Sequence, residues 1–295
     1  MATSSHFDRS AKSLSAAYRL KATLGSGGAA HVYLAEELRT GRRVAIKVLR
    51  EDLAASVSAS RFLAEIGIAA GLAHPNIVSV CASGTADGLP YYVMPFFEGQ
   101  SLRARLARSG RIPLDEVLHI VSDVSSALDY AHARRVVHRD IKPENVLLHS
   151  GLAQLLDFGI ALALDATEHP RRTGPGLLIG TPDYMSPEQA QGIPHIDGRS
   201  DVYSLACVVY EMIWGHPPFR GVPTRVVIRH INAEPMPLGC RLPGLSHALS
   251  AAVSRALSKA PEQRFSTAGA FAAALRDACG RSDRRNCNHA LHRVA

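Results

Sequence analysis

The stretch His138-Arg139-Asp140-Ile141-Lys142-Pro143-Glu144-Asn145 is the most informative part of the sequence. Five positions separate Asp140 from Asn145, so this loop can direct a carboxylate at a hydroxyl group and an amide at a metal ion. Asp157-Phe158-Gly159 begins twelve residues later and places a second carboxylate on a turn after an apolar strand. Two oxygen ligands from adjacent segments suit Mg²⁺, which keeps water and phosphate oxygens in its other positions.

A glycine-rich turn from Leu24 to Val32 lies between two expected strands. Glycine lets backbone N–H groups approach a phosphate, although such turns are also common without a ligand. A strand follows the turn, which excludes a dinucleotide-binding fingerprint. Lys47 lies in the apolar strand 44–49, either as an edge lysine that reaches solvent or as a cation that holds phosphates. An inward Lys47 needs a carboxylate partner, for which Glu65 on the next helix is the best candidate.

Length and composition predict a globular protein of two domains or lobes. The chain has 295 residues, of which 46% are apolar and 20% charged, close to globular averages. No window holds 18 uninterrupted apolar residues, and the first twenty residues lack a signal core. The five scattered cysteines are typical of reduced thiols. We therefore expect a cytoplasmic protein without a membrane span.

The order of expected elements changes along the chain. Residues 1–17 are expected to be a flexible lead-in, and 18–49 reads as three strands. Apolar spacing then predicts one helix and two short strands, followed by a mainly helical part that includes a hairpin at Ser150-Gly151. The expected helices are 58–73, 114–133, 200–214, 224–232, 246–257 and 268–278, and the expected short strands are 77–80, 91–94, 146–148 and 153–156. The region 160–180 shows no period, which is typical of a functional or mobile loop.

Charge offers one alternative function. The net charge is +7, of which the segment 281–295 supplies +3 through four arginines and one aspartate. A basic tail can contact nucleic acid, but a solvated chain end is the simpler interpretation. We therefore expect no nucleic-acid partner, and salt-dependent binding lost with this segment would indicate one.

These motifs together resemble a protein kinase, most of all the bacterial kinases of eukaryotic type. The resemblance extends from Tyr18 to Ala278, and its signature set is the general one for the family. It implies an α+β, bilobal fold with a β-rich N-lobe at 18–95, which carries one regulatory helix, and a mainly helical C-lobe at 99–278. It also implies that ATP binds between the lobes, and it leaves 279–295 as a basic C-terminal tail.

The resemblance implies catalytic roles by position. Asp140 would be the catalytic base, and Lys142 would neutralise charge on the transferred phosphoryl group. Lys47, paired with Glu65, would hold the α- and β-phosphates, while Asn145 and Asp157 would bind Mg²⁺, with Mn²⁺ as an alternative. The implied ATP contacts are Leu24, Gly25, Ser26, Gly27, Gly28, Val32, Ala45, Lys47, Met94, Pro95, Phe97 and Leu147. Ala30 replaces the third glycine, at little cost where its φ is negative.

The segment 180–188 resembles the end of a kinase activation segment. The resemblance implies that Glu188 forms a buried pair with Arg264, and that Asp201 anchors the catalytic loop. Lys142-Pro143-Glu144, with Thr181 in the substrate-facing loop, resembles Ser/Thr kinases rather than tyrosine kinases.

Regulation is expected in the segment 160–180, which precedes Thr181. Arg139, next to the base Asp140, is typical of kinases that need a negative charge in this segment, and a phosphate group can supply that charge. Autophosphorylation in trans is expected at Thr173, which follows Arg171-Arg172, with Thr167 secondary. The implied partners are protein substrates, ATP and a second kinase copy. The alternative is a pseudokinase that serves as a nucleotide-binding scaffold.

Overall fold

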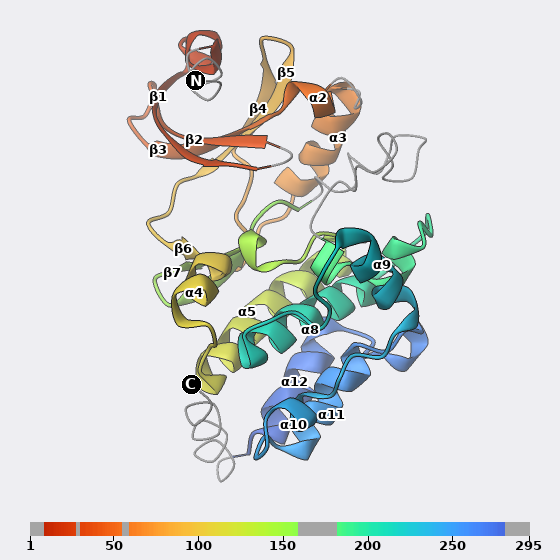
Figure 1. The fold of residues 1–295 in the computed structure, drawn as a ribbon. Coiled ribbons are helices and arrows are strands. Elements are labelled where there is room, and N and C mark those ends of the chain that lie inside the picture. The colour runs from red at the N-terminus through yellow and green to blue at the C-terminus, as the bar shows by residue number, and fades with distance from the viewer. Residues whose placement is uncertain (1–8, 28–29, 55–58, 159–181, 281–295) are drawn as a thin grey trace. The chain divides into compact units, whose positions relative to one another are not determined.

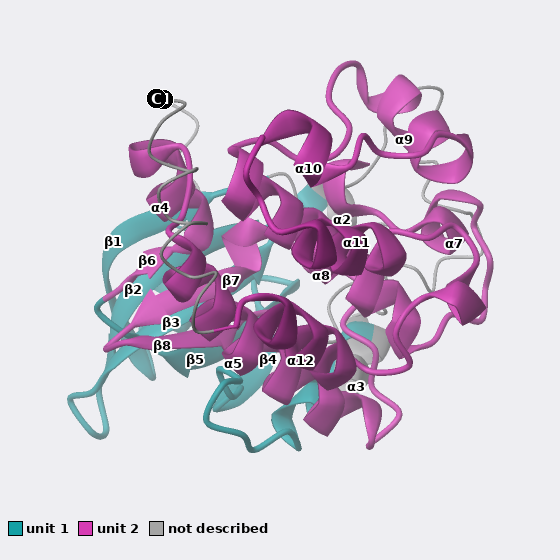
Figure 2. Cartoon of the chain, turned by 90° about the horizontal axis from the view of Figure 1, so that it is seen from below, with its two compact units in different colours: residues 1–98, 158–180 teal, residues 99–157, 181–295 magenta. Residues whose placement is uncertain are grey.

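The structure, a computed structural model, describes residues 9–27, 30–54, 59–158 and 182–280 in two compact units. Unit 1 contains the described residues of 1–98 together with Phe158, and unit 2 contains those of 99–157 and 182–280 (Figure 2). The chain thus passes from a sheet-rich unit to a helix-rich unit after Glu98, and the α+β class is confirmed.

Unit 1 is built on a five-stranded antiparallel sheet in the order β1-β2-β3-β5-β4 (Figure 1). Alternate residues of β3 point into the core, where Val44, Ile46 and Val48 pack with Tyr33 of β2. Helix α3 packs against β4 and β5. The elements are β1 (Tyr18–Ser26), β2 (Ala30–Glu37), β3 (Arg43–Leu49), α2 (Glu51–Ala54), α3 (Ala59–Ala70), β4 (Ala82–Ala86) and β5 (Leu89–Pro95).

The N-terminal segment differs from the expected flexible lead-in. Residues 9–14 are helical, and Leu14 is only 4% exposed because it packs into the core of the sheet beside Tyr18. One large apolar side chain among serines and alanines shows no period, so the sequence pattern could not indicate this contact.

The expected strand at 77–80 is wrong, since only Ile77 forms a bridge. Ile77 and Val78 are buried without belonging to a strand, so their apolar character reflects burial alone. The strand that forms instead is β4, at the edge of the sheet. An edge strand needs no apolar alternation, and the sequence Ala-Ser-Gly-Thr-Ala of β4 offers none.

Unit 2 combines a three-stranded sheet, in the order β6-β7-β8, with a group of helices (Figure 1). The hairpin between β7 and β8 has positive φ at Ser150 (48°) and Gly151 (78°), as predicted for a tight turn. The elements are β6 (Gln100–Ser101), α4 (Leu102–Ser109), α5 (Leu114–His132), η1 (Pro143–Asn145), β7 (Val146–His149), β8 (Leu152–Leu155), η2 (Pro182–Tyr184), α7 (Pro187–Ala190), α8 (Gly198–Trp214), α9 (Pro223–Asn232), α10 (Leu238–Arg241), α11 (His247–Ala256), η3 (Pro261–Gln263) and α12 (Ala268–Ala278).

Helix α8 forms the centre of unit 2. It is buried continuously from Ser200 to Ile213, and α5, α11 and α12 pack around it. The Asp197 side chain caps its first turn, and Gly215, with φ of 91°, ends it in the left-handed region. Among the described residues, no helix combines the length and apolar character needed to cross a membrane.

Candidate functional site

Two neighbouring side chains hold the carboxylate of Asp140. Lys142 Nζ lies 2.6 Å from Asp140 Oδ2, and Asn145 Nδ2 donates to the same oxygen at 3.0 Å. Asn145 Nδ2 also donates to the backbone oxygen of Asp140 at 2.8 Å. The short helix η1 makes this possible, because it turns the chain after Lys142 and brings Asn145 back over Asp140. The Asp140 side chain is still 40% exposed, so the hydroxyl group of another molecule can approach it from the solvent side.

Asp201 holds the backbone just before Asp140. It is fully buried on α8, where Oδ2 accepts from His138 N and Oδ1 from Arg139 N, each at 2.8 Å. Nε2 of His132, at the end of α5, lies 2.7 Å from Oδ2. Burial favours the neutral carboxyl, but the bond to His132 outweighs it and lowers the pKa of Asp201. An ionised Asp201 can accept all three bonds at once.

A buried histidine joins this loop to the chain before Asp157. His138 Nε2 donates to Leu156 O at 2.8 Å, because a carbonyl can only accept. Its Nδ1 then accepts from Asp140 N at 3.3 Å. Leu156 N in turn donates to Asn145 O at 2.9 Å. Both polar backbone atoms of Leu156 are thereby tied to the loop, which places Asp157 next to Asn145.

The pair Asn145 and Asp157 fits a magnesium ion by its chemistry. Because Nδ2 of Asn145 faces Asp140, its amide oxygen is the atom left to act as a metal ligand. Asp157 adds a carboxylate from a residue with φ of 67°, a conformation that non-glycine residues rarely adopt. Two protein oxygens leave room for the waters and phosphate oxygens that Mg²⁺ prefers.

The remaining predicted phosphate contacts lie in unit 1. Lys47 lies in the middle of β3, opposite Val32 of β2 and Tyr92 of β5, and its Nζ is 5.9 Å from the centre of the Tyr92 ring. Glu65 lies on α3, but its side chain is outside the described part, so its pairing with Lys47 stays a prediction.

The glycine-rich turn has open space beside it. No described atom lies within 4 Å of the position that a Cβ would take at Gly25 or Gly27. Ser26 Oγ lies 3.0 Å from His31 Nδ1 across the turn, and Leu24 is 46% exposed. Ala30 is not among the residues with positive φ, so the alanine fits here without strain. Gly28 lies outside the described residues.

The predicted adenine contacts divide between the units. In unit 1, Ala45 of β3 pairs with Met94 of β5, and both side chains are buried. Pro95 ends β5, and Phe97 follows it, half-buried. Leu147 lies on β7 in unit 2, so its place beside the other contacts remains a prediction.

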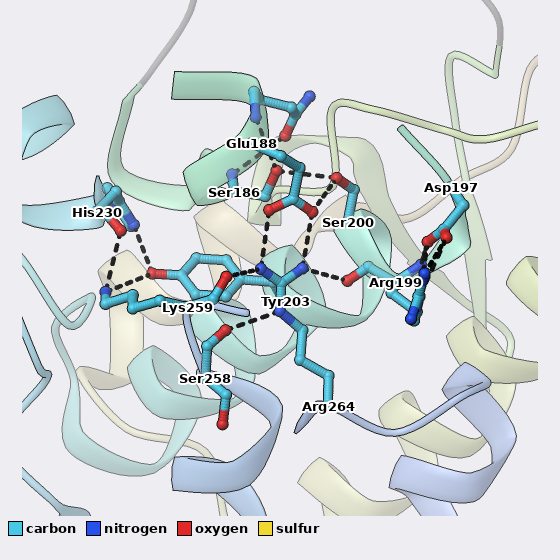
Figure 3. A network of polar contacts seen from close by, with 11 residues as sticks. Ser186, Glu188, Asp197, Arg199, Ser200, Tyr203, His230, Ser258, Lys259 and Arg264 are labelled. Atoms are coloured by element: carbon cyan, nitrogen blue, oxygen red, sulfur yellow. Dashed lines mark hydrogen bonds and ion pairs between the residues drawn. The ribbon is translucent and has the colours of Figure 1, made fainter. Parts of the chain in front are cut away.

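Glu188 and Arg264 form a buried ion pair, as Figure 3 shows. The guanidinium donates from Nη1 to Glu188 Oε1 at 2.7 Å and from Nη2 to Oε2 at 2.8 Å, and Arg264 is only 2% exposed. Ser200 Oγ adds a bond to Oε1 at 2.5 Å. Burial favours the neutral Glu188, but Arg264 outweighs it and lowers the pKa of this carboxyl.

Thr167 and Thr173, the predicted phosphorylation sites, and Thr181, predicted to lie in the substrate-facing loop, all lie outside the described residues. Their roles stay predictions.

Sequence reasoning missed a polar network in unit 2 centred on Arg103 of α4. Arg103 donates to Glu144 at 2.7 Å and to the buried Glu211 at 2.7 Å, and it also contacts the hydroxyl of Tyr184. Burial and the neighbouring Glu211 raise the pKa of Asp183 nearby. These side chains line a cavity of about 480 Å³. The sequence offered one signal of this network, which is the charged Glu211 within the otherwise mostly apolar expected helix 200–214.

Comparisons with known proteins agree with these motifs. The protein kinase domain family matches residues 18–275. Serine/threonine-protein kinase PknB of Mycobacterium leprae is 42% identical over 269 residues, which cover 89% of the chain and 43% of the relative, and PknB of Mycobacterium tuberculosis gives the same values. The probable serine/threonine-protein kinase PknB of Bifidobacterium longum is 37% identical over 266 residues, which cover 86% of the chain and 38% of the relative. The chain therefore spans less than half the length of these curated relatives.

Proposed function

Because the chain belongs to the protein kinase domain family, which matches residues 18–275, we propose that it transfers the γ-phosphate of ATP to serine and threonine hydroxyls of proteins. The observation that carries the proposal is the grip of Lys142 and Asn145 on Asp140. These contacts hold the Asp140 carboxylate at an exposed position. Asn145 and Asp157 in the same part of the chain offer the two oxygen ligands that suit Mg²⁺.

Asp140 orients the acceptor hydroxyl and accepts its proton. Its Oδ2 is the oxygen that Lys142 and Asn145 contact, so Oδ1 is the one expected to meet the hydroxyl. As that proton leaves, the hydroxyl oxygen bonds to the γ-phosphorus, and the bond from this phosphorus to the ADP oxygen breaks. Lys142, whose Nζ lies 2.6 Å from Asp140 Oδ2, would neutralise negative charge on the phosphoryl oxygens. The protein contributes mainly positioning and charge stabilisation.

ATP and a divalent cation are the family's usual reactants, and we assign the cation as Mg²⁺. When bound, it neutralises charge on the phosphates. Asn145 and Asp157 would hold it, since two oxygen ligands suit Mg²⁺ and leave its other positions for water and phosphate. Lys47 would hold the α- and β-phosphates with Glu65 as its partner. The turn at Gly25 and Gly27 would cover them.

We assign the adenine to a site formed by apolar side chains, which would contact the ring, and by backbone atoms, which would bond to its edge. Val32, Ala45 and Leu147 would contact its faces, and Met94 would lie behind it. Pro95 and Phe97 would read its edge with backbone atoms, for which the carbonyl of a proline suffices. Leu24, Ser26 and Gly28 complete the proposed ATP contacts.

The acceptor class is assigned to serine and threonine from the segment Lys142-Pro143-Glu144 and from Thr181 in the substrate-facing loop. Autophosphorylation in trans at Thr173 would require two copies of the kinase to meet. The cytoplasmic location stays a prediction. A catalytically silent scaffold has no observation in its favour, because Lys47, Asp140 and Asp157 are all present.

The test uses the purified chain, radiolabelled ATP and a generic basic protein, with hydrolysis of the product to single amino acids. We expect label on phosphoserine and phosphothreonine, dependent on Mg²⁺ and weaker with Mn²⁺ alone. Label on phosphotyrosine alone would contradict the acceptor class, and full transfer after removal of divalent ions would contradict the metal assignment.

A further inference from the structure

The backbone of Arg139, immediately before Asp140, has an unusual conformation. Its φ is 67°, in the left-handed region that residues other than glycine rarely adopt. Such a conformation is strained, and it persists only where contacts with the surrounding structure offset the strain. The contacts of the Arg139 N–H and C=O groups are therefore the ones that determine how Asp140 is presented.

Two side chains from different elements hold these two groups. Asp201 of α8 accepts from Arg139 N at 2.8 Å. On the other side, Nε2 of Gln189 in α7 donates to Arg139 O at 2.7 Å. Arg139 O belongs to the peptide unit that leads into Asp140, so a shift of this oxygen moves the Asp140 backbone directly.

The Gln189 side chain is itself fixed at both ends. Its Oε1 accepts from Ser186 N at 3.1 Å, while Gln189 N donates to Ser186 Oγ at 3.3 Å, which forms a capping box at the start of α7. Because Oε1 is bound to an N–H group, Nε2 must be the atom that faces Arg139 O. Ser186 Oγ lies 2.9 Å from Ser200 Oγ, which ties the box to α8 (Figure 3).

We propose that Gln189 is a positioning residue for phosphoryl transfer, which holds the carbonyl of Arg139 and thereby fixes Asp140 for its acceptor. The proposal rests on the proposed function above. Gln189 adds the donor that Asp201 cannot supply, since an ionised carboxylate only accepts. It also makes α7 a part of the catalytic arrangement, so that a displacement of α7 releases Asp140.

Gln189→Glu is the informative substitution because it replaces the NH₂ group of the side chain by an oxygen and leaves the side-chain volume almost unchanged. At neutral pH the new carboxylate has no proton to donate and faces a carbonyl oxygen. The protonated carboxyl can donate, so the lost bond returns as pH falls. Gln191→Glu is the matched control, since Gln191 lies two residues later, is exposed and carries no such side-chain bond among the described contacts.

Steady-state kinetics and hydrogen exchange test the proposal together. At about pH 8, we expect Gln189→Glu to lower kcat roughly 10- to 100-fold, the scale of a small misplacement, with the KM for ATP changed less than about twofold. The ratio of variant to wild-type kcat should rise as pH falls towards about 6. Taking this ratio removes the pH dependence that the wild type and the variant share. The ionisable groups on the elements around α7 and the loop are Asp140, Lys142, Glu188, Arg264, Asp201, His132 and Lys259, together with His230, which is neutral because burial lowers its pKa to about 3. Gln191→Glu should match the wild type.

Amide exchange across 136–145 gives a readout that does not depend on activity. We expect faster exchange in Gln189→Glu than in Gln191→Glu, with equal melting temperatures for the two. Unchanged exchange, or a kcat ratio near one at every pH, would overturn the positioning role. A wild type without any transfer would refute the proposed function instead, and the exchange data would then still decide whether Gln189 holds the loop.

Discussion

Arg264→Ala removes the partner of a buried carboxylate and should destabilise unit 2 without touching the reacting groups. All five N–H groups of Arg264 have acceptors. Two are the oxygens of Glu188, and three are backbone oxygens, of Arg199 at 2.9 Å, Ser258 at 2.8 Å and Lys259 at 2.9 Å. The substitution therefore strands one charge and three carbonyls (Figure 3).

The expected loss follows from the burial of the pair. Removing one member of a buried ion pair costs about 3–5 kcal/mol, because the other charge remains without compensation. For a domain of this size each kcal/mol lowers the melting temperature by roughly 2–4 °C, so the expected decrease is about 6–20 °C. The melting temperature of Arg264→Lys should lie between those of the wild type and Arg264→Ala, since an ammonium group keeps the charge but lacks the planar fork of donors.

The dependence on pH gives this prediction a second check. The pKa of Glu188 is lowered in the folded protein, because Arg264 outweighs the effect of burial. Its stabilising contribution is thus present above the ordinary carboxyl pKa and is lost as pH falls through the folded value. The difference in melting temperature between wild type and Arg264→Ala should therefore shrink as pH is lowered.

Calorimetry measures both effects, and Arg255→Ala is the control. Arg255 is exposed on α11, where it lies 4.3 Å from the Phe265 ring centre, a contact worth about 0.5–1 kcal/mol. A decrease for Arg264→Ala of less than about 2 °C, no larger than that of the control, would refute the reasoning.

Three further predictions concern other parts of the site. Burial opposes the charge of His132, but Asp201 outweighs it and raises the pKa of His132. The stabilisation of the fold by charged His132 is therefore full below about pH 6.5 and is lost as pH rises through the pKa of the folded protein. In urea unfolding, His132→Phe should lack this loss of stability, and a pH dependence equal to that of the wild type would contradict the account. Asp157→Asn should raise the Mg²⁺ concentration for half-maximal activity at least about tenfold, and an unchanged value would remove Asp157 from the metal site. Mass spectrometry should find phosphate on Thr173, with Thr167 secondary, and Thr173→Ala should lower activity; an unmodified Thr173 and a fully active variant would contradict the switch.

The sequence predicted the parts of the fold that have a strong period or a strong motif. Helices α5 and α8 were expected within two residues of their ends, because their apolar residues recur at helical spacing or run without interruption. The edge strand β4 and the four-residue helices α2, α7 and α10 were not predicted. Short elements are held by tertiary contacts rather than by a pattern of their own.

The candidate site divides in the same way. Asp140 and Asn145 are close in sequence, and their contact could be expected from the loop between them. Glu188 and Arg264 are 76 residues apart, so only the resemblance to known kinases indicated their pairing. Gln189 was missed altogether, because a glutamine beside a buried glutamate gives no sequence signal of its bond to Arg139.

Phosphate transfer by the wild type and by Asp140→Asn tests the central claim most directly. The substitution keeps the size of the side chain and removes the carboxylate that orients the hydroxyl and accepts its proton. With radiolabelled ATP, Mg²⁺ and a basic protein, we expect the rate to fall roughly 10²- to 10⁴-fold, while nucleotide binding and melting temperature stay near the wild-type values. Full wild-type turnover in Asp140→Asn, with the same nucleotide binding, would contradict the assignment of Asp140 as the catalytic base.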